Sequence, residues 1–255
     1  MCPRRFLKHI VGAEKAGAEV ILISVWTTKM QNPMQQLQHY RNIIDNTPTR
    51  VKLLLHIEDL WFVNKQNTDD LIKLRPFSVG LTWNADNNLA GGANCDGTLK
   101  PLGRVVIEKL AASGIIIDLA HLNRPSFYAV ATLLTSLNQK LLCTHTCIAE
   151  INPHPRNLTP HQVKTIVDSG GLIGITLVGD FLTAKKRATL CDIYSHIKYF
   201  TENFGEDNLA IGTDFFGTTH LPKGLTKYKH FKRLEKFLSD KILHTNAKRF
   251  LGSYE

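Results

Sequence analysis

The 255-residue sequence has no apolar run long enough to cross a membrane. Its longest uninterrupted apolar stretches, near VILI and VKLLL, fall far short of the roughly 20 residues that a bilayer span needs. The N-terminus also lacks the apolar core of a signal peptide, because charges return at Lys8 and Glu14. We therefore expect no membrane span and a cytoplasmic location.

Cysteine is scarce, and its spacing is wrong for a disulfide framework. The five cysteines are an odd number without any C-x-x-C pair: Cys2, Cys95, Cys143, Cys147 and Cys191. This pattern favours free thiols in a reducing compartment.

Acidic residues are fewer than basic ones, with 22 Asp and Glu against 31 Lys and Arg, which leaves a formal net charge of +9. Such an excess can indicate a nucleic-acid partner. However, much of it lies in the KKR triplet at 185–187 and in the segment 223–241. We interpret these segments as solvated helix faces and expect no nucleic-acid partner.

Short aliphatic and β-branched runs alternate with helical patterns along the whole chain. We predict strands at 19–26, 51–58, 78–84, 114–121, 140–146, 170–178 and 209–215. We predict helices between them at 34–44, 102–113, 126–137, 159–170 and 193–205. This alternation predicts an α/β fold with a parallel sheet, either a (β/α) barrel or a doubly wound sheet.

A (β/α) barrel of the TIM type closes with eight strands, and only seven can be read here. No linker or change of composition divides residues 1–255, so we expect a single domain. If the fold is a barrel, its first strand is missing and the chain opens in a first helix at 5–17.

Polar residues collect where the predicted strands end, at Glu58, Asn84, His121, His145 and Asp214. In a (β/α) barrel the C-terminal ends of the strands converge on the active site. One Glu, two His and one Asp form a donor set suited to Zn²⁺ or a similar ion. Any one of them alone could be a hydrogen-bonded side chain at the core rim, but four at four strand ends favour a site.

Several motifs together resemble the membrane (renal-type) dipeptidase family, from about Val20 to the end of the chain. They are IEDLWF, LTWNADNNLAGGA, GRVVIEKLAASGIIIDLAHLN, THT, HPRNLT, GGLIGI and IGTDFFG, and NAKRFL resembles the family's closing helix. The resemblance implies a (β/α)₈ barrel that carries two zinc ions and hydrolyses dipeptides.

The same resemblance implies a role for each candidate residue. Glu58 matches the carboxylate that bridges the two metals, and His121 and His145 match the imidazole ligands of the second metal. Asp214 matches the acid/base aspartate, and Arg156 matches the arginine that holds the substrate's C-terminal carboxylate. We also expect Asn84 to contact the substrate. A metal-activated water and a guanidinium that binds a carboxylate make a coherent peptidase chemistry.

The sequence departs from the family where the first metal should be held. The family uses an H-x-D pair at the end of its first strand, and the only early histidine here, His9, lies in a helix-like segment. One zinc ion or fewer is therefore possible. Phe216 also replaces the second aspartate of the family's DFDG, and Trp83 stands where some members place a substrate-contacting histidine.

Four other residues near these motifs have alternative interpretations. His56 points to the same side of its strand as Glu58, but we expect a buried, hydrogen-bonded histidine rather than a ligand. Cys143 and Cys147 flank His145, and we interpret them as free buried thiols rather than zinc ligands. Asp118 alternates away from His121 and is interpreted as structural.

Two other functions remain open at this point. The chain can be a degenerate family member that binds at most one metal and no longer catalyses. It can also be another metal-dependent barrel hydrolase, such as a nuclease, which would bind nucleic acid in a salt-sensitive way. A homodimer is possible in each case.

Overall fold

The structure is a computed structural model, and it describes residues 3–27, 29 and 31–253. Its strands are β1 (Val20–Trp26), β2 (Lys52–Glu58), β3 (Ser78–Gly80), β4 (Ile116–Asp118), β5 (Leu142–Thr146), β6 (Leu172–Ile175) and β7 (Leu209–Ile211). Its α-helices are α1 (Pro3–Glu14), α2 (Pro33–Asp45), α3 (Thr68–Lys73), α4 (Pro101–Ala112), α5 (Arg124–Ser136), α6 (Pro160–Asp168), α7 (Gly179–Leu182), α8 (Leu190–Phe204) and α9 (Asn246–Gly252). Two shorter helical segments, η1 (Tyr228–Arg233) and η2 (Lys241–Thr245), precede α9.

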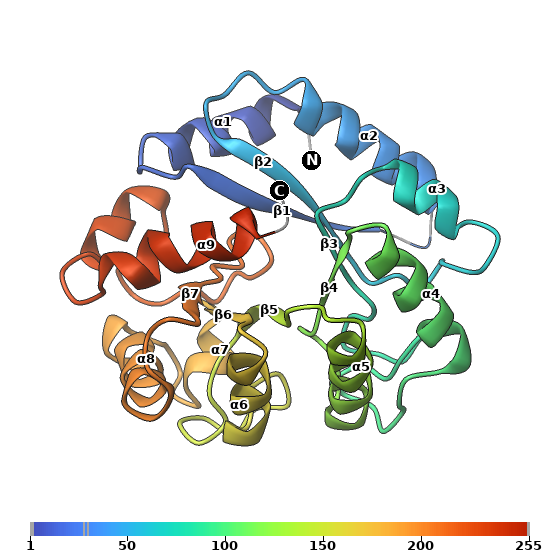
Figure 1. Cartoon of the computed structure of the whole chain (residues 1–255). Coiled ribbons are helices and arrows are strands. Elements are labelled where there is room, and N and C mark those ends of the chain that lie inside the picture. Colours follow the sequence, from blue (N-terminus) through green and yellow to red (C-terminus); the bar gives the residue numbers. More distant parts are fainter. Residues whose placement is uncertain (1–2, 28, 30, 254–255) are drawn as a thin grey trace.

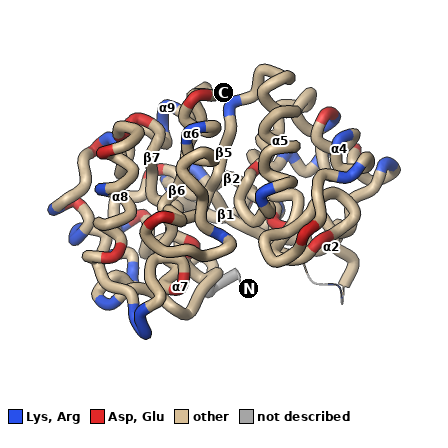
Figure 2. The backbone as a smooth tube through the Cα atoms, turned by 90° about the horizontal axis from the view of Figure 1, so that it is seen from below, with Lys and Arg blue, Asp and Glu red and all other residues tan. Residues whose placement is uncertain are grey.

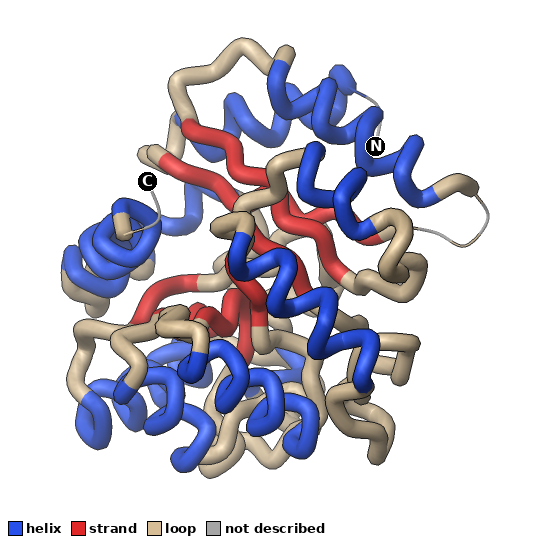
Figure 3. Tube along the Cα trace, turned by 45° about the vertical axis from the view of Figure 1, so that its right-hand side comes forward, coloured by secondary structure: helices blue, strands red, loops and turns tan. Residues whose placement is uncertain are grey.

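The seven strands form one parallel sheet in the order in which they occur along the chain. The sheet curls, and the helices form a layer around its outer side (Figures 1 and 3). The predicted TIM-type barrel with seven readable strands is thus confirmed as a partial barrel. Within the described residues β1 and β7 are the two ends of the sheet.

Helix α9 lies on the side of the barrel between β1 and β7 (Figure 1). It contacts β6 and β7, and Lys248 on α9 forms an ion pair with Glu19, just before β1, with Nζ and Oε2 2.6 Å apart. The closing helix predicted at NAKRFL therefore packs beside the two ends of the sheet.

Local sequence signals explain where the outer helices begin. Asn32 and Asn123 cap α2 and α5 by accepting hydrogen bonds from backbone N–H groups, and proline follows in the first turn of each helix. Thr159 and Gln162 form a reciprocal capping box at the start of α6. These caps satisfy backbone donors that a helix end leaves unpaired.

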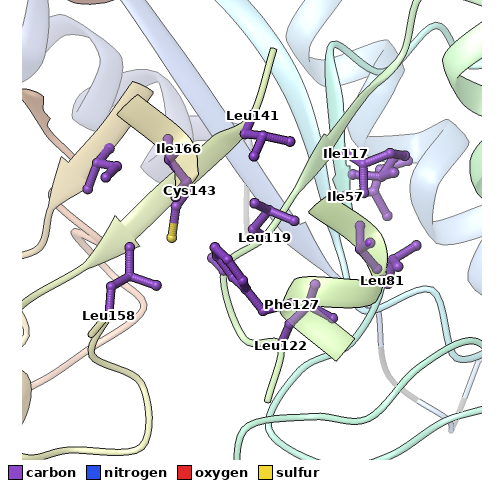
Figure 4. Close-up of a cluster of buried hydrophobic side chains, with 14 of the residues drawn as sticks. Ile57, Leu81, Ile117, Leu119, Leu122, Phe127, Leu141, Cys143, Leu158 and Ile166 are labelled. Carbon is purple, nitrogen blue, oxygen red and sulfur yellow. The ribbon is translucent and has the colours of Figure 1, made fainter. Parts of the chain in front are cut away.

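The hydrophobic core lies between the strands and the outer helices. Figure 4 shows part of it, where the ring of Phe127 of α5 lies near Leu119, the residue that follows β4. Phe127 and Ile57 are fully buried, as are Leu81 and Leu141. This packing fixes the strands and so fixes the residues at their C-terminal ends.

Four strands, β3, β4, β6 and β7, end earlier than the sequence predicts. β3, β4 and β7 stop at Gly80, Asp118 and Ile211, and the chain turns before it reaches the polar residues. His121 and Asp214 have φ angles of 69° and 49°, in the left-handed region that no strand residue adopts. His121 and Asp214 therefore lie in loops at the barrel mouth, defined here as the C-terminal ends of the strands and the loops that follow them, whereas Glu58 and His145 lie in the last residues of β2 and β5.

No helix in the described part of the chain is long and apolar enough to span a bilayer. On the face shown in Figure 2, basic and acidic positions are interspersed along the outer helices. Some of the basic residues are paired within one helix, such as Lys164 with Asp168 and Lys198 with Glu202.

Candidate metal centre

Three potential metal ligands converge at the barrel mouth, each from a different strand or strand end. Oε1 of Glu58 lies 2.9 Å from Nε2 of His121 and 3.6 Å from Nε2 of His145. The two Nε2 atoms are themselves 2.9 Å apart. Among the described residues, this is the single group of three or more His, Cys, Asp or Glu side chains whose donor atoms lie close enough to share one ion.

The hydrogen bonds around the two imidazoles direct both Nε2 atoms towards this cluster. Nδ1 of His121 lies 2.9 Å from Oδ1 of Asn84, and Nδ1 of His145 lies 2.8 Å from Oγ1 of Thr144. Nη2 of Arg156 lies 2.9 Å from Nε2 of His145, and a guanidinium can only donate. Nε2 of His145 therefore presents its lone pair, which is the form that binds a metal.

Burial sets the protonation of the three side chains. It lowers the pKa of His121 and His145 well below the usual range, and the positive charge of Arg156 lowers both further. Burial also raises the pKa of Glu58, against the opposing effect of His56 and Arg156. Two neutral imidazoles beside a carboxyl group form a donor set that suits a divalent cation.

Asp214 lies at the same mouth, three residues beyond β7, but it is not one of the three clustered ligands. Burial and the charge of Glu58 raise its pKa to about 7, while Arg156 opposes this shift. The loop after it approaches closely, since a Cβ atom on Gly217 would lie 2.0 Å from Oδ1 of Asp214. A carboxyl group with a pKa near neutrality can both accept and donate a proton.

Arg156 is a buried cation without an acidic partner. Only 5% of it is exposed, its Nε has no hydrogen-bond partner, and burial lowers its pKa. No carboxylate of the described residues lies within ion-pair distance of it. Its guanidinium packs over the ring of Phe181, with 5.3 Å between the guanidinium carbon and the ring centroid. A buried charge of this kind is costly unless an anion pairs with it.

The other residues discussed from the sequence lie close to the cluster. His56 is buried and its Nδ1 lies 2.8 Å from Oγ of Ser78, which confirms a buried, hydrogen-bonded histidine. Asp118 is also hydrogen-bonded, as expected, by the backbone N–H groups of Ala120 and Thr144. Cys143 and Cys147 are buried free thiols, and burial raises the pKa of each.

Sequence reasoning missed Thr144, whose hydroxyl contacts both His145 and Asp118. The signal was present in the THT motif, because a hydroxyl residue directly before a ligand histidine can reach its ring. The sequence placed Trp83 near the site by resemblance, but it did not predict that Trp26 would lie beside Trp83. The rings of Trp83 and His121 are 6.1 Å apart, and those of Trp83 and Trp26 are 6.0 Å apart.

His9 lies on α1, as predicted, and stacks on Phe216 with ring centroids 4.0 Å apart. It is not part of the three-ligand cluster. The clustered donors of the described residues therefore fit one ion, held by Glu58, His121 and His145. A second ion sharing Glu58 would need further donors beyond that cluster.

The sequence pattern of the membrane dipeptidase family (peptidase family M19) matches residues 12–252. The chain belongs to the membrane dipeptidase family. A relative in this comparison is the Klebsiella pneumoniae protein described as "Uncharacterized protein in pqqA 5'region", which is 33% identical over 195 residues. The match covers 68% of this chain and 70% of that protein.

Solved structures show the same fold as this membrane dipeptidase family member. An amidohydrolase from Pseudomonas aeruginosa has a TM-score of 0.83 at 20% identity, covering 97% of this chain and 92% of its own. A metallopeptidase from Rhodobacter sphaeroides, solved with a phosphinate mimic of the dipeptide L-Ala-D-Ala, has a TM-score of 0.73 at 20% identity. That alignment covers 97% of this chain and 73% of the Rhodobacter protein.

Proposed function

We propose that this protein is a zinc-dependent dipeptidase that hydrolyses the peptide bond between two amino acids. The observation that carries the proposal is Arg156, a buried guanidinium without an acidic partner among the described residues. It contacts the cluster of three potential metal ligands through His145. A dipeptide supplies the missing anion as its C-terminal carboxylate. The family membership supports the proposal, as does the dipeptide mimic bound to the Rhodobacter metallopeptidase.

Glu58, His121 and His145 would hold the metal ion. When bound, the ion would polarise the peptide carbonyl and lower the pKa of a coordinated water. Zinc suits the set of two imidazoles and one carboxylate better than the oxygen-rich sites of magnesium or calcium.

The chain's own residues bind the dipeptide and move protons. Arg156 would donate hydrogen bonds to the terminal carboxylate and so place the peptide bond above the cluster. Asp214, whose pKa is raised to about 7, would accept a proton from the attacking water and give it to the leaving amine. Asn84 would orient His121 through its amide, and its predicted contact with substrate stays a prediction.

A second candidate is a non-catalytic family member that binds one metal ion. The single cluster of three ligands among the described residues favours this alternative over a protein without any metal. The two candidates predict the same metal content but differ in turnover.

The deciding experiment combines metal counting with a dipeptide assay. The protein would be stripped with a chelator, reloaded with Zn²⁺, and assayed by ninhydrin detection of free amino acids from L,L and L,D dipeptides. We expect one bound zinc ion and turnover that is lost in Asp214→Asn. Zinc binding without turnover of any dipeptide would support the non-catalytic alternative, and no zinc binding would refute both.

A further inference from the structure

A chain of hydrogen bonds runs from the imidazole of His145 into the interior of the barrel. Nδ1 of His145 lies 2.8 Å from Oγ1 of Thr144, and that oxygen lies 2.5 Å from Oδ2 of Asp118. Oδ1 of the same carboxylate accepts from the backbone N–H groups of Thr144 and Ala120, at 2.9 and 3.0 Å. Asp118 thus holds Thr144 by both its backbone and its hydroxyl.

The direction of this chain follows from the chemistry of its members. An ionised carboxylate can only accept, so the single hydroxyl proton of Thr144 points to Asp118. The oxygen of Thr144 then has only lone pairs left for His145, and Nδ1 of His145 must carry the proton. The contact of Arg156 on the other side of the ring indicates the same tautomer, because the guanidinium donates to Nε2 and Nε2 must then be unprotonated.

A second buried histidine lies beside the same oxygen of Asp118, beyond hydrogen-bond distance. Nε2 of His56 lies 3.6 Å from Oδ2 of Asp118, and Nδ1 of His56 is bonded to Oγ of Ser78. Asp118 and His56 are 1% and 2% exposed, so water does not compete for the hydrogen bonds that Asp118 accepts. The carboxylate is therefore held in one position between β2, β4 and β5.

His121 lacks an equivalent arrangement. Its Nδ1 contacts the amide of Asn84, which offers a donor on one side and an acceptor on the other. An amide can turn over, so this contact restrains the ring without fixing which nitrogen carries the proton. The tautomer of His145 is thus fixed by its hydrogen bonds, whereas that of His121 is not.

We propose that Thr144 and Asp118 are positioning residues that fix the tautomer and orientation of His145 for metal binding. The inference rests on the proposed function, because it concerns the same three potential metal ligands. The Thr144 hydroxyl links the carboxylate of Asp118 to the ring of His145, which the carboxylate does not itself contact. It keeps the Nε2 lone pair directed at Glu58 and His121, and it makes that nitrogen a better ligand.

The test compares Thr144→Val, which keeps the side-chain shape but removes the hydroxyl, with Thr144→Ser, which keeps the hydroxyl. Each full-length protein would be titrated with Co²⁺ against a competing chelator, and the visible absorption of bound Co²⁺ would be recorded. We expect Thr144→Val to weaken Co²⁺ binding by about 10 to 100-fold. Thr144→Ser should restore binding to within about threefold of the unaltered protein.

Thr146→Val is a matched control on the same strand. Thr146 is buried and adjacent to His145, but its hydroxyl contacts the backbone oxygens of Arg156 and Cys147, at 2.9 and 3.3 Å, and does not contact the imidazole. A loss of Co²⁺ affinity in Thr146→Val as large as that in Thr144→Val would overturn the inference. Equal binding by Thr144→Val and the unaltered protein would overturn it as well.

A spectroscopic measurement covers the case in which Thr144→Val does not fold. Nitrogen chemical shifts of the His145 ring, measured by NMR on the unaltered, chelator-treated protein, report its tautomer directly. We expect the Nδ1–H form, and the Nε2–H form would overturn the inference. If the unaltered protein binds no Co²⁺ at all while His145 is Nδ1–H, the proposed function fails and the positioning of the ring stands.

Discussion

The guanidinium of Arg156 and the imidazole of His145 meet at the barrel mouth, with Nη2 of the arginine 2.9 Å from Nε2 of the histidine. Both side chains are buried, at 5% and 8% exposure. The nitrogen that would bind a metal is therefore the nitrogen that accepts from the arginine. A fixed positive charge beside a cation site opposes the cation, while the same charge attracts a substrate carboxylate.

Replacing Arg156 should consequently change metal binding and catalysis in opposite directions. We expect Arg156→Met to bind Co²⁺ at least as tightly as the unaltered protein, because a competing donor and a positive charge are gone. The kcat/KM for dipeptides should fall by about 10 to 100-fold, the equivalent of one charge-assisted hydrogen bond of roughly 1.5–3 kcal/mol.

Dipeptide amides provide the control for this prediction, because they lack the C-terminal carboxylate. Their hydrolysis should be slow in the unaltered protein and should change little in Arg156→Met. An equal loss for dipeptides and their amides would mean that Arg156 does not bind the carboxylate.

The raised pKa of Asp214 predicts how the stability of the metal-free protein depends on pH. Its pKa is about 7 in the fold against an ordinary value of 3.8, so the folded state holds a proton that the unfolded state has lost between these values. Asp214 therefore reduces stability as the pH rises through this window. Asp214→Asn should remove that loss.

Urea denaturation in the presence of a chelator measures this effect. The free energy of unfolding of Asp214→Asn, relative to the unaltered protein, should increase by about 2.5 kcal/mol between pH 5 and pH 8, at roughly 1.4 kcal/mol for each pKa unit. The histidines of the cluster titrate in both proteins and cancel in the difference. A difference that is constant over this pH range would show that Asp214 is already ionised at pH 5.

The sequence was sufficient to predict the sheet and the residues at its mouth, because hydrophobic runs and βα alternation are local signals. It could not predict the link from Asp118 to His145. The alternation of side chains along β4 indicates that Asp118 and His121 point in different directions. The partner of Asp118, however, is Thr144 on the neighbouring strand β5, and it depends on the register between the two strands. The left-handed turns at His121 and Asp214 were also not predictable, since neither residue type requires them.

The short helices α3 and α7 were missed for a related reason. They contain six and four residues, too few to show a helical period. α7 matters for the site, since it carries Phe181, on which Arg156 packs. A site residue such as Phe181 can be identified only from the fold, because no sequence pattern links it to Arg156.

Gly212 controls the close approach of β7 to the strand that carries His145. A Cβ atom on Gly212 would lie 1.8 Å from the backbone oxygen of Thr144. Gly212→Ala should therefore displace β5 and destabilise the protein by about 2–3 kcal/mol, the usual cost of overpacking. It should also weaken Co²⁺ binding, because Thr144 and His145 move together.

Gly114→Ala is the matched control for this substitution. Gly114 has a φ of 76°, and a Cβ atom there would have no neighbour within 4 Å. Its replacement should cost about 1 kcal/mol through backbone strain alone and leave Co²⁺ affinity unchanged. Urea denaturation and Co²⁺ titration of both variants measure the contrast, and equal metal affinities would show that the strand does not shift.

The thiols should differ sharply in reactivity. Cys191 is exposed, whereas burial raises the pKa of Cys143 and Cys147 and keeps them protonated. Iodoacetamide at pH 8 should alkylate Cys191 in the native protein, and mass spectrometry should find Cys143 and Cys147 modified only after unfolding. Rapid alkylation of either buried thiol that zinc prevents would instead identify that cysteine as a metal ligand.

Trp83 offers an optical report on the metal cluster, since its ring centroid lies 6.1 Å from that of His121. Its side chain is 45% exposed, and Trp26 lies beside it at 6.0 Å. A paramagnetic ion such as Co²⁺ bound to His121 should quench the fluorescence of this pair. Trp83→Phe should lose most of the quenching, whereas Trp61→Phe should retain it, because the indole N–H of Trp61 is bonded to Thr27 rather than to a residue of the cluster. Quenching that survives in Trp83→Phe but disappears in Trp61→Phe would place the bound ion elsewhere, on the side of the mouth that carries Trp61.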